Sequence, residues 1–361
     1  MLYQVIKYVC ANSPMENVFQ YISFRAVCAA LTSLCFSLLF CPLIRKMIMR
    51  LNMLENISDV HEGLYEKHQK KQGIPSMGGI LIILAIFFAL ILWADLKNFY
   101  IQIGVLVIIG MGLLGFVDDM MKAFSREKKG LTMKNKFLCQ VVLTAGIGFL
   151  IYRHDPEALF LTIPFFKNIS IDLGWLYIGL MFLVILGTCN AVNVTDGLDG
   201  LATGSLIMSF SAYAVFAYVV GHRYLSEYFY VLHIPGVGEL AVFCAAVIGA
   251  CMGFLWFNTN PASIFMGDTG SLTLGGALGV VAILVKQELI LIIIGGVFVI
   301  EMLSVIIQII FFKTTGRRFF LIAPLHHHFE MKGLSETQIV VRFWILAIVF
   351  SLIGLLTLKL R

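Results

Sequence analysis

Five aspartates lie in three short polar segments of an otherwise apolar chain. Asp118 and Asp119 follow GLLGFV, Asp196 and Asp199 lie in NAVNVTDGLDG, and Asp268 lies in WFNTNPASIFMGDTGS. A lone Asp before an apolar run is usually a helix N-cap. Five carboxylates brought to one level repel one another unless a divalent cation, a shared proton or a cationic substrate group lies between them. Mg²⁺ suits such a place, because it takes one or two carboxylates together with phosphate oxygens and water. The sequence therefore favours a Mg²⁺-phosphate site over simple caps.

Two of these segments are also glycine-rich starts of apolar runs, GLDGLATG and GDTGSLTLGG. The N-terminus of a helix binds anions through its free N–H groups, and glycine lets a ligand approach the backbone closely. The chain contains no G-x-x-x-x-G-K-[ST], which argues against a P-loop nucleotide site. A G-x-G-x-x-G occurs at Gly110–Gly115, but it lies inside a predicted transmembrane run and not between a strand and a helix, which argues against a Rossmann site.

Cations flank the same segments. Lys70 and Lys71 precede PSMGG, and a second basic group follows the Asp pair. A single lysine there most often reflects topology or contact with lipid headgroups, but together they would hold a lipid phosphate and a nucleotide phosphate. The second group consists of Lys122, Arg126, Lys128, Lys129, Lys134 and Lys136.

His326, His327 and His328 are consecutive. Adjacent residues in regular structure cannot all face one ion, so we expect contact with phosphate, or acid–base chemistry, rather than a metal site with three histidine ligands. Glu301 lies inside an apolar run, where an ionisable residue indicates function by default. A structural hydrogen-bonded partner inside the bundle is the equally weighted alternative for Glu301.

The elements that position these residues follow from the composition. Hydrophobic residues make up 60% of the 361-residue chain and charged residues 13%, far from the roughly 45–50% and 25% of soluble domains. We predict an all-α polytopic membrane protein, a single domain over 1–361, with ten transmembrane helices of about 20 residues each. The run at 289–312 contains Gly295 and Gly296 and is expected to be bent or broken. The ten runs are roughly 22–44, 78–95, 100–117, 136–152, 174–189, 200–220, 238–256, 271–286, 289–312 and 339–358.

The distribution of positive charge predicts the orientation. Loops 45–77 and 118–136 carry six Lys and Arg residues each, and loop 313–338 carries four. With Arg342 they hold 17 of the 26 cations. Positive loops stay in the cytoplasm, so we expect both termini outside and all five aspartates at the cytoplasmic mouth. The stretch Phe160–Asp172, around Lys167 and Asn168, predicts a small β-hairpin on the outer surface.

Four separated motifs resemble one family. FVDD at Phe116–Asp119, NAVNVTDGLDGL at Asn190–Leu201, FMGDTGSL at Phe265–Leu272 and APLHHHFE at Ala323–Glu330 are together similar to the polyprenyl-phosphate N-acetylhexosamine-1-phosphate transferases. The triple histidine and PSMGG at Pro75–Gly79 resemble the bacterial branch that uses a muramoyl-pentapeptide donor. The resemblance covers essentially the whole chain.

The resemblance implies an activity. UDP-N-acetylmuramoyl-pentapeptide would donate its phospho-sugar to undecaprenyl phosphate, giving lipid I and UMP in peptidoglycan synthesis, with Mg²⁺ required. The site would face the cytoplasm from a bacterial cytoplasmic (inner) membrane, in a homodimer embedded in membrane lipid, with no nucleic-acid partner. Both substrates are anionic, so a metal and cationic groups would relieve their repulsion and stabilise the transition state.

The resemblance also assigns residues. Asp268 would be the Mg²⁺ ligand, and one of Asp118 and Asp119 would deprotonate or position the lipid phosphate, or act as a nucleophile. His326 would contact the pyrophosphate, and Phe265 would stack on uracil. One departure is that the family usually reads TPTMGG where this chain reads IPSMGG, although Ser76 keeps a hydroxyl. The substrate-binding positions implied are Lys71, Ser76, Lys122, Lys134, Asn193, Asp196, Gly197, Leu198, Asp199, Asn258, Phe265, Gln308, His327 and His328.

Two rival functions are weighed against this one. A secondary transporter of nucleotide-sugars would place polar residues at the membrane midplane in paired broken helices, whereas here the acids lie at one face and the sequence has no visible inverted repeat. A sibling transferase using UDP-N-acetylglucosamine is disfavoured by the histidine run, and only through the resemblance.

Overall fold

The computed structural model describes residues 18–51, 53–54, 71–124, 130–155, 159–166 and 170–360. Within these ranges, nine helices are long and apolar enough to cross a membrane, so the chain is a multi-pass membrane protein, as the composition predicts. The nine helices are α3 (Ile22–Arg50), α6 (Phe99–Phe124), α7 (Met133–His154), α8 (Trp175–Thr195), α9 (Leu201–Gly221), α11 (Leu240–Asn258), α12 (Gly267–Leu284), α14 (Gly296–Thr315) and α16 (Glu336–Leu356).

The tenth predicted run forms a shorter helix, α5 (Gly79–Trp93), of 15 residues. At about 1.5 Å per residue, α5 alone is shorter than a hydrocarbon core of roughly 30 Å, so the count of ten spans stays a prediction. The run at 289–312 is divided between α13 (Glu288–Ile294) and α14, which meet at Gly295. The predicted break is confirmed.

Smaller elements connect the long helices. β1 (Phe160–Thr162) and β2 (Ser170–Asp172) pair antiparallel, with Phe160 opposite Asp172. The predicted hairpin is confirmed, although its tip at 167–169 lies outside the described residues. The other short elements are α10 (Arg223–Phe229), η2 (Val237–Glu239) and α15 (Leu325–Met331).

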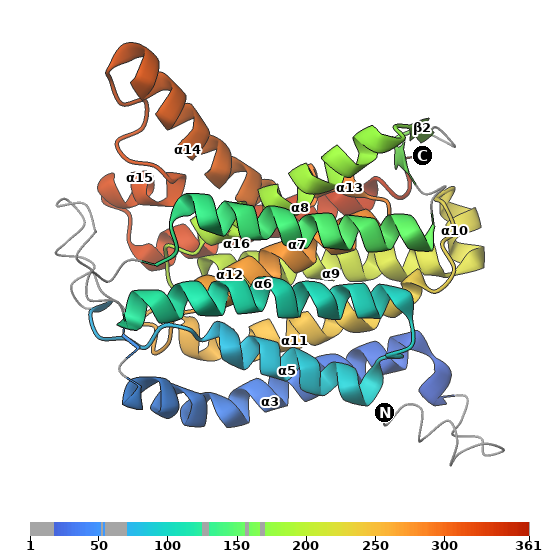
Figure 1. The fold of residues 1–361 in the computed structure, drawn as a ribbon, viewed down its shortest axis with the longest axis horizontal. Coiled ribbons are helices and arrows are strands. Elements are labelled where there is room, and N and C mark those ends of the chain that lie inside the picture. Colours follow the sequence, from blue (N-terminus) through green and yellow to red (C-terminus); the bar gives the residue numbers. More distant parts are fainter. Residues whose placement is uncertain are drawn as a thin grey trace.

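Most of the long helices lie side by side in one bundle, and α14 departs from it obliquely (Figure 1). α15 begins beside Glu301, in the second turn of α14. The start of α3 and the end of α16 lie at one end of the bundle. The end of α6 and the start of α12 lie at the opposite end. The bundle therefore separates the ends of the described chain from the helix termini that carry the acidic motifs.

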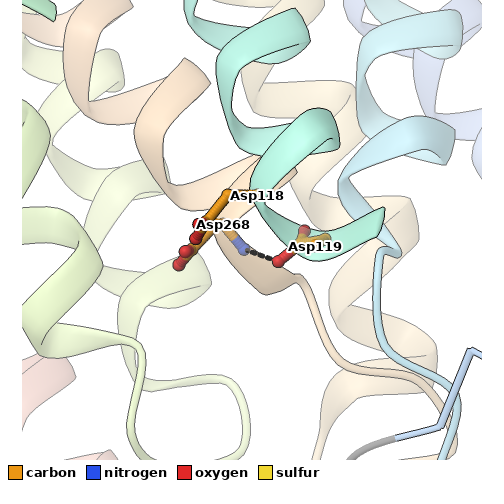
Figure 2. Close-up of side chains that lie close together, drawn as sticks. All are labelled: Asp118, Asp119 and Asp268. Atoms are coloured by element: carbon orange, nitrogen blue, oxygen red, sulfur yellow. Dashed lines mark hydrogen bonds between the residues drawn. The ribbon is translucent and has the colours of Figure 1, made fainter. Parts of the chain in front are cut away.

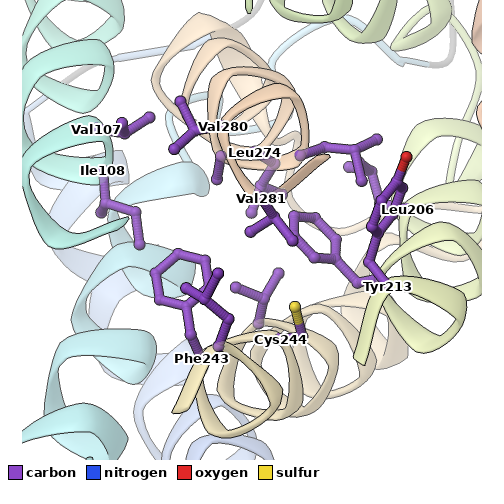
Figure 3. Packing of buried hydrophobic residues seen from close by; sticks show 14 of the residues in the cluster. Val107, Ile108, Leu206, Tyr213, Phe243, Cys244, Leu274, Val280 and Val281 are labelled. Atoms are coloured by element: carbon purple, nitrogen blue, oxygen red, sulfur yellow. The ribbon is translucent and has the colours of Figure 1, made fainter. Parts of the chain in front are cut away.

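α12 forms the centre of the bundle. Its Leu274, Val280 and Val281 pack among side chains of α6, α9 and α11 (Figure 3). On the side facing α8, a Cβ added at Gly275 would lie 2.8 Å from the Cα of Cys189. Small residues allow helix backbones to approach this closely in membranes, so α12 is enclosed by protein and holds its N-terminus in a fixed place.

Candidate active site

Three of the five aspartates come together from two helices. Asp118 and Asp119 lie near the end of α6 and Asp268 lies in the first turn of α12, with ligand oxygens within 4.8 Å of one another. Gly115, one turn before the pair, makes this approach possible, because an added Cβ would clash with the backbone oxygen of Asp268. Asp118 and Asp268 point the same way, while Asp119 lies to one side (Figure 2).

Asp118 and Asp268 share two ammonium groups. Lys122 Nζ lies 2.9 Å from Asp118 Oδ2 and 2.6 Å from Asp268 Oδ2. Lys136 Nζ, from the start of α7, lies 3.4 Å and 2.7 Å from the same two oxygens. Positive charge relieves the repulsion that two carboxylates would otherwise suffer, so this pair of oxygens is a place that accepts cations.

Asp119, unlike Asp118, is hydrogen-bonded to the start of α12. Its carboxylate accepts hydrogen bonds from Asp268 N at 3.2 Å (dashed in Figure 2), from Thr269 N at 2.9 Å and from Thr269 Oγ1 at 2.7 Å. These donors belong to the first turn of α12, whose free N–H groups and positive dipole end favour an anion. Asp119 therefore caps α12 from a neighbouring helix, whereas Asp118 forms ion pairs with the two lysines.

The donor set fits a magnesium ion. Carboxylate oxygens are hard ligands of the kind that Mg²⁺ prefers, and the two ammonium groups lie where such a cation would be attracted. Asn193 Nδ2 donates to Asp268 Oδ1 at 2.5 Å and to Ser271 Oγ at 2.8 Å. A partner of this kind orients a metal-binding carboxylate.

A second polar group surrounds Lys71. Its Nζ lies 2.7 Å from Asp199 Oδ1 and 2.6 Å from Glu336 Oε1, and 5.9 Å from the centroid of the Phe265 ring. Burial favours the neutral amine, but the carboxylates of Glu336 and Asp199 outweigh it and hold the pKa of Lys71 above its ordinary value. Lys71 is therefore a buried, charged amine beside an aromatic ring.

Asn258 and Leu198, two of the residues predicted to bind the nucleotide, contact other parts of the protein itself. Asn258 Oδ1 accepts hydrogen bonds from Gly200 N at 3.0 Å and Thr203 Oγ1 at 3.2 Å, and its Nδ2 donates to Ile264 O at 2.9 Å. Leu198 is buried in a small apolar cluster of α9, α14 and α16 residues. Through these contacts both shape the GLDG turn.

Ser76 lies shortly before α5, and Asp196 and Gly197 directly follow α8. Ser76 Oγ would lie 3.2 Å from a Cβ added at Gly267, beside the start of α12. Asp196 is the half-buried C-cap of α8. A Cβ at Gly197 would clash with the ring of His326, so this glycine makes room for the histidine.

Glu301 organises the start of α15. Its carboxylate accepts hydrogen bonds from Leu325 N at 2.9 Å and His326 N at 3.2 Å, and lies 3.1 Å from His326 Nδ1. Both side chains are fully buried. This geometry agrees with the structural alternative for Glu301, and it also aims His326 Nε2 at Gly197. That nitrogen has no hydrogen-bond partner among the described residues.

The other two histidines have separate partners. His327 Nδ1 lies 2.6 Å from Glu330 Oε2, and His328 Nδ1 accepts from Leu321 N at 3.1 Å. Partial burial, and then Lys332, lower the pKa of His328, which agrees with a neutral acceptor ring.

Gln308 and Lys134 lie away from the carboxylate cluster. Gln308 Oε1 accepts from Phe319 N at 3.2 Å and Phe320 N at 2.9 Å, fixing the segment after α14. Lys134 is exposed on the first turn of α7. The lysine that reaches the carboxylates from α7 is Lys136.

Asn260 and Glu336 are absent from the sequence-based assignments, and Lys136 is included there only as one member of the second basic group. The polar Gln140, four residues after Lys136, marks the same face of α7. Gln140 Oε1 accepts a hydrogen bond from Asn190 Nδ2 at 3.1 Å. Nothing in the local sequence marks Asn260 or Glu336, because their partners lie far away in the chain.

The chain is similar to known transferases over its full length. Residues 101–286 match the family model described as Glycosyl transferase family 4, and residues 71–83 match phospho-N-acetylmuramoyl-pentapeptide-transferase signature 1. The phospho-N-acetylmuramoyl-pentapeptide-transferases of Desulfosudis oleivorans and Geobacter sp. (strain M21) are 50% and 46% identical to it, with 100% of both chains covered. The Thermodesulfovibrio yellowstonii protein of the same name is 46% identical at the same coverage.

Proposed function

The chain belongs to the phospho-N-acetylmuramoyl-pentapeptide-transferase family, and from this premise we propose that it makes lipid I. In this reaction UDP-N-acetylmuramoyl-pentapeptide gives its phospho-sugar to undecaprenyl phosphate, and UMP is released. The observation that carries the proposal is the pair Asp118 and Asp268, which shares Lys122 and Lys136 at the start of α12. A pair of carboxylates with shared cations beside a helix N-terminus suits chemistry between two phosphates.

The chemistry assigns distinct tasks to the residues. An oxygen of the lipid phosphate attacks the phosphorus next to the sugar, and the bond from that phosphorus to the oxygen of UMP breaks. Asp118 faces the shared cations and would position or deprotonate the lipid phosphate. Asp119 holds the first turn of α12, so that Asp268 stays in place. Lys122 and Lys136 would follow negative charge from the carboxylates to the phosphates as the substrates bind.

A magnesium ion fits the proposed site. Asp268, with Asp118 beside it, would hold the ion, which would neutralise phosphate charge and stabilise the transition state. His326, held by Glu301, would contact the pyrophosphate.

The remaining predicted positions would bind the substrates. Phe265 would stack on uracil beside the charged Lys71 amine. The positions proposed around the nucleotide are Lys71, Ser76, Asn193, Asp196, Gly197, Leu198, Asp199, Asn258 and Phe265. Those proposed toward the phosphates and the sugar are Lys122, Lys134, Gln308, His327 and His328.

The proposal includes the membrane orientation and the oligomeric state of the protein. The cation-rich loops support ten spans, both termini outside and a site facing the cytoplasm in the bacterial cytoplasmic membrane. A homodimer is expected from the family. A C55 lipid and a cytosolic nucleotide can both reach the cytoplasmic end of a helix bundle.

The test compares two donors. The purified protein in detergent, with Mg²⁺ and undecaprenyl phosphate, should release UMP from UDP-N-acetylmuramoyl-pentapeptide and should do so far more slowly from UDP-N-acetylglucosamine. The opposite preference would indicate the sibling transferase. Uptake of a nucleotide-sugar into vesicles without UMP formation would indicate transport instead.

A further inference from the structure

Glu336, the first residue of the last long helix, lies against the GLDG turn at the start of α9. Its Oε1 accepts hydrogen bonds from Lys71 Nζ at 2.6 Å and Asp199 N at 2.7 Å. Its Oε2 accepts from Asn260 Nδ2 at 3.0 Å. One carboxylate therefore joins three segments that are 265, 137 and 76 residues away from it in the chain.

Asn260 closes this network. Its Nδ2 also donates to Asp199 Oδ2 at 3.1 Å, and Ala262 N donates to the same oxygen at 3.0 Å. Since Lys71 lies against the other oxygen of Asp199, both oxygens of that carboxylate are fixed. We call Lys71, Asp199, Asn260 and Glu336 the Lys71 clamp.

α16 holds Glu336 rigidly. The helix start is closed by a capping box between Ser335 and Gln338. Two turns later, Trp344 Nε1 donates to Gly200 O at 3.1 Å, and the Trp344 ring fills the space that a Cβ at Gly204 would need. A group that positions others precisely must itself be locked by packing, and the contacts of α16 meet that requirement.

We propose that Glu336, with Asn260 as its second arm, is a positioning residue of the nucleotide pocket. It holds the Lys71 amine beside the Phe265 ring and fixes the backbone of the GLDG turn, so that both meet the UDP part of the donor. This inference rests on the proposed function. The last helix is then part of the donor site, although it carries none of the family motifs.

The charges support a positioning role over direct contact. Glu336 and Asp199 are both acidic, and a carboxylate that touched the donor phosphates would repel them. Directed at Lys71, the same carboxylates keep the buried amine charged. Among the described residues, removing Glu336 leaves Asp199 as the one carboxylate beside Lys71 and takes this acceptor from the Asp199 amide, while Asp118 and Asp268 are untouched. Donor binding should weaken, and the transfer step should not.

The test uses Glu336→Ala, Glu336→Gln and Asn260→Ala in the full-length protein. For Glu336→Ala we expect the KM for the donor to rise about tenfold or more, with kcat within about threefold and the KM for undecaprenyl phosphate unchanged. Glu336→Gln keeps an oxygen acceptor and should lie between the wild type and Glu336→Ala. Asn260→Ala should act in the same direction more weakly. Thr337→Ala is the matched control, because it changes an exposed side chain in the same helix turn.

UMP binding separates this inference from the proposed function. If the wild type releases UMP from neither donor, the proposed function fails, and a lower UMP affinity in Glu336→Ala and Glu336→Gln would still support the clamp. If kcat falls while the donor KM stays constant, or if Thr337→Ala changes the donor KM equally, Glu336 has only a structural role and the inference is overturned. Absence of both UMP release and UMP binding in the wild type would overturn both. If Glu336→Ala does not fold, Glu336→Gln carries the comparison.

Discussion

Asp119 caps the helix that begins beside Thr269, accepting both the backbone N–H and the hydroxyl of that residue. The paired aspartates of FVDD are therefore unequal, because Asp118 instead faces two lysines. The Asp119 carboxylate holds the first turn of α12, and the Asp118 carboxylate faces Lys122 and Lys136.

This inequality predicts different phenotypes. Asp119→Ala removes the hydrogen bonds at the start of α12 and should destabilise the protein by about 1–3 kcal/mol, with activity lost as Asp268 moves. Asp118→Asn keeps the shape and should lower kcat by about 100-fold or more with a much smaller change in Tm. Thermal unfolding in detergent and UMP release, measured together, check both. Equal losses of Tm in the two variants would contradict the division of roles.

Asp268→Asn should abolish turnover in a folded protein. It removes the carboxylate charge that Lys122 and Lys136 share and that a metal would need, so we expect kcat to fall by at least about 100-fold. Raising Mg²⁺ should not restore it. Asp172→Asn, exposed in β2, is the control and should behave as wild type. Near-normal UMP release from Asp268→Asn would remove Asp268 from the chemistry.

Lys136→Met should lower kcat by about tenfold or more. Without this amine, Lys122 is the one cation left between Asp118 and Asp268 among the described residues, and the repulsion between the two carboxylates increases. Asn135→Ala changes the neighbouring exposed side chain on the same helix turn and should leave the rate of UMP release unchanged. A normal rate in Lys136→Met would mean that Lys122 alone serves the carboxylates.

Gly115→Ala should separate α6 from α12. The new methyl group would clash with the Asp268 backbone, and overpacking of this kind typically costs about 1–3 kcal/mol. We expect a lower Tm and a lower kcat. Gly146→Ala is the matched helical control, because no atom of the described residues lies within 4 Å of the added Cβ, and it should be neutral or stabilising by about 0.5–1 kcal/mol. Unchanged activity in Gly115→Ala would show that the helices can shift without harm.

The sequence predicted the helical bundle well because each apolar run reflects a local property. The break at Gly295 and the hairpin that begins at Phe160 follow from glycine and β-branched patterns within a few residues. The order and direction of the predicted spans were enough to place Asp118, Asp119 and Asp268 at the same end of the bundle.

Contacts between distant segments were out of reach of the sequence. Whether Glu301 serves structure or chemistry depended on its contact with His326, 25 residues later. Glu336 meets Lys71 across 265 residues. The different contacts of Asp118 and Asp119 depend on the direction in which each side chain points from α6. That direction follows from helix packing, and the sequence shows only two adjacent aspartates.

The enclosure of α12 has a consequence for how the protein is made. Of the nine candidate spans, this helix has the lowest mean hydropathy and the largest share of its residues buried in the protein. A weakly apolar segment enters a bilayer poorly by itself, so we expect α12 to depend on helices already inserted, above all α6 and α8. Asp268 would then reach its working position only after those neighbours are in place, and an incompletely assembled chain would be inactive in the membrane.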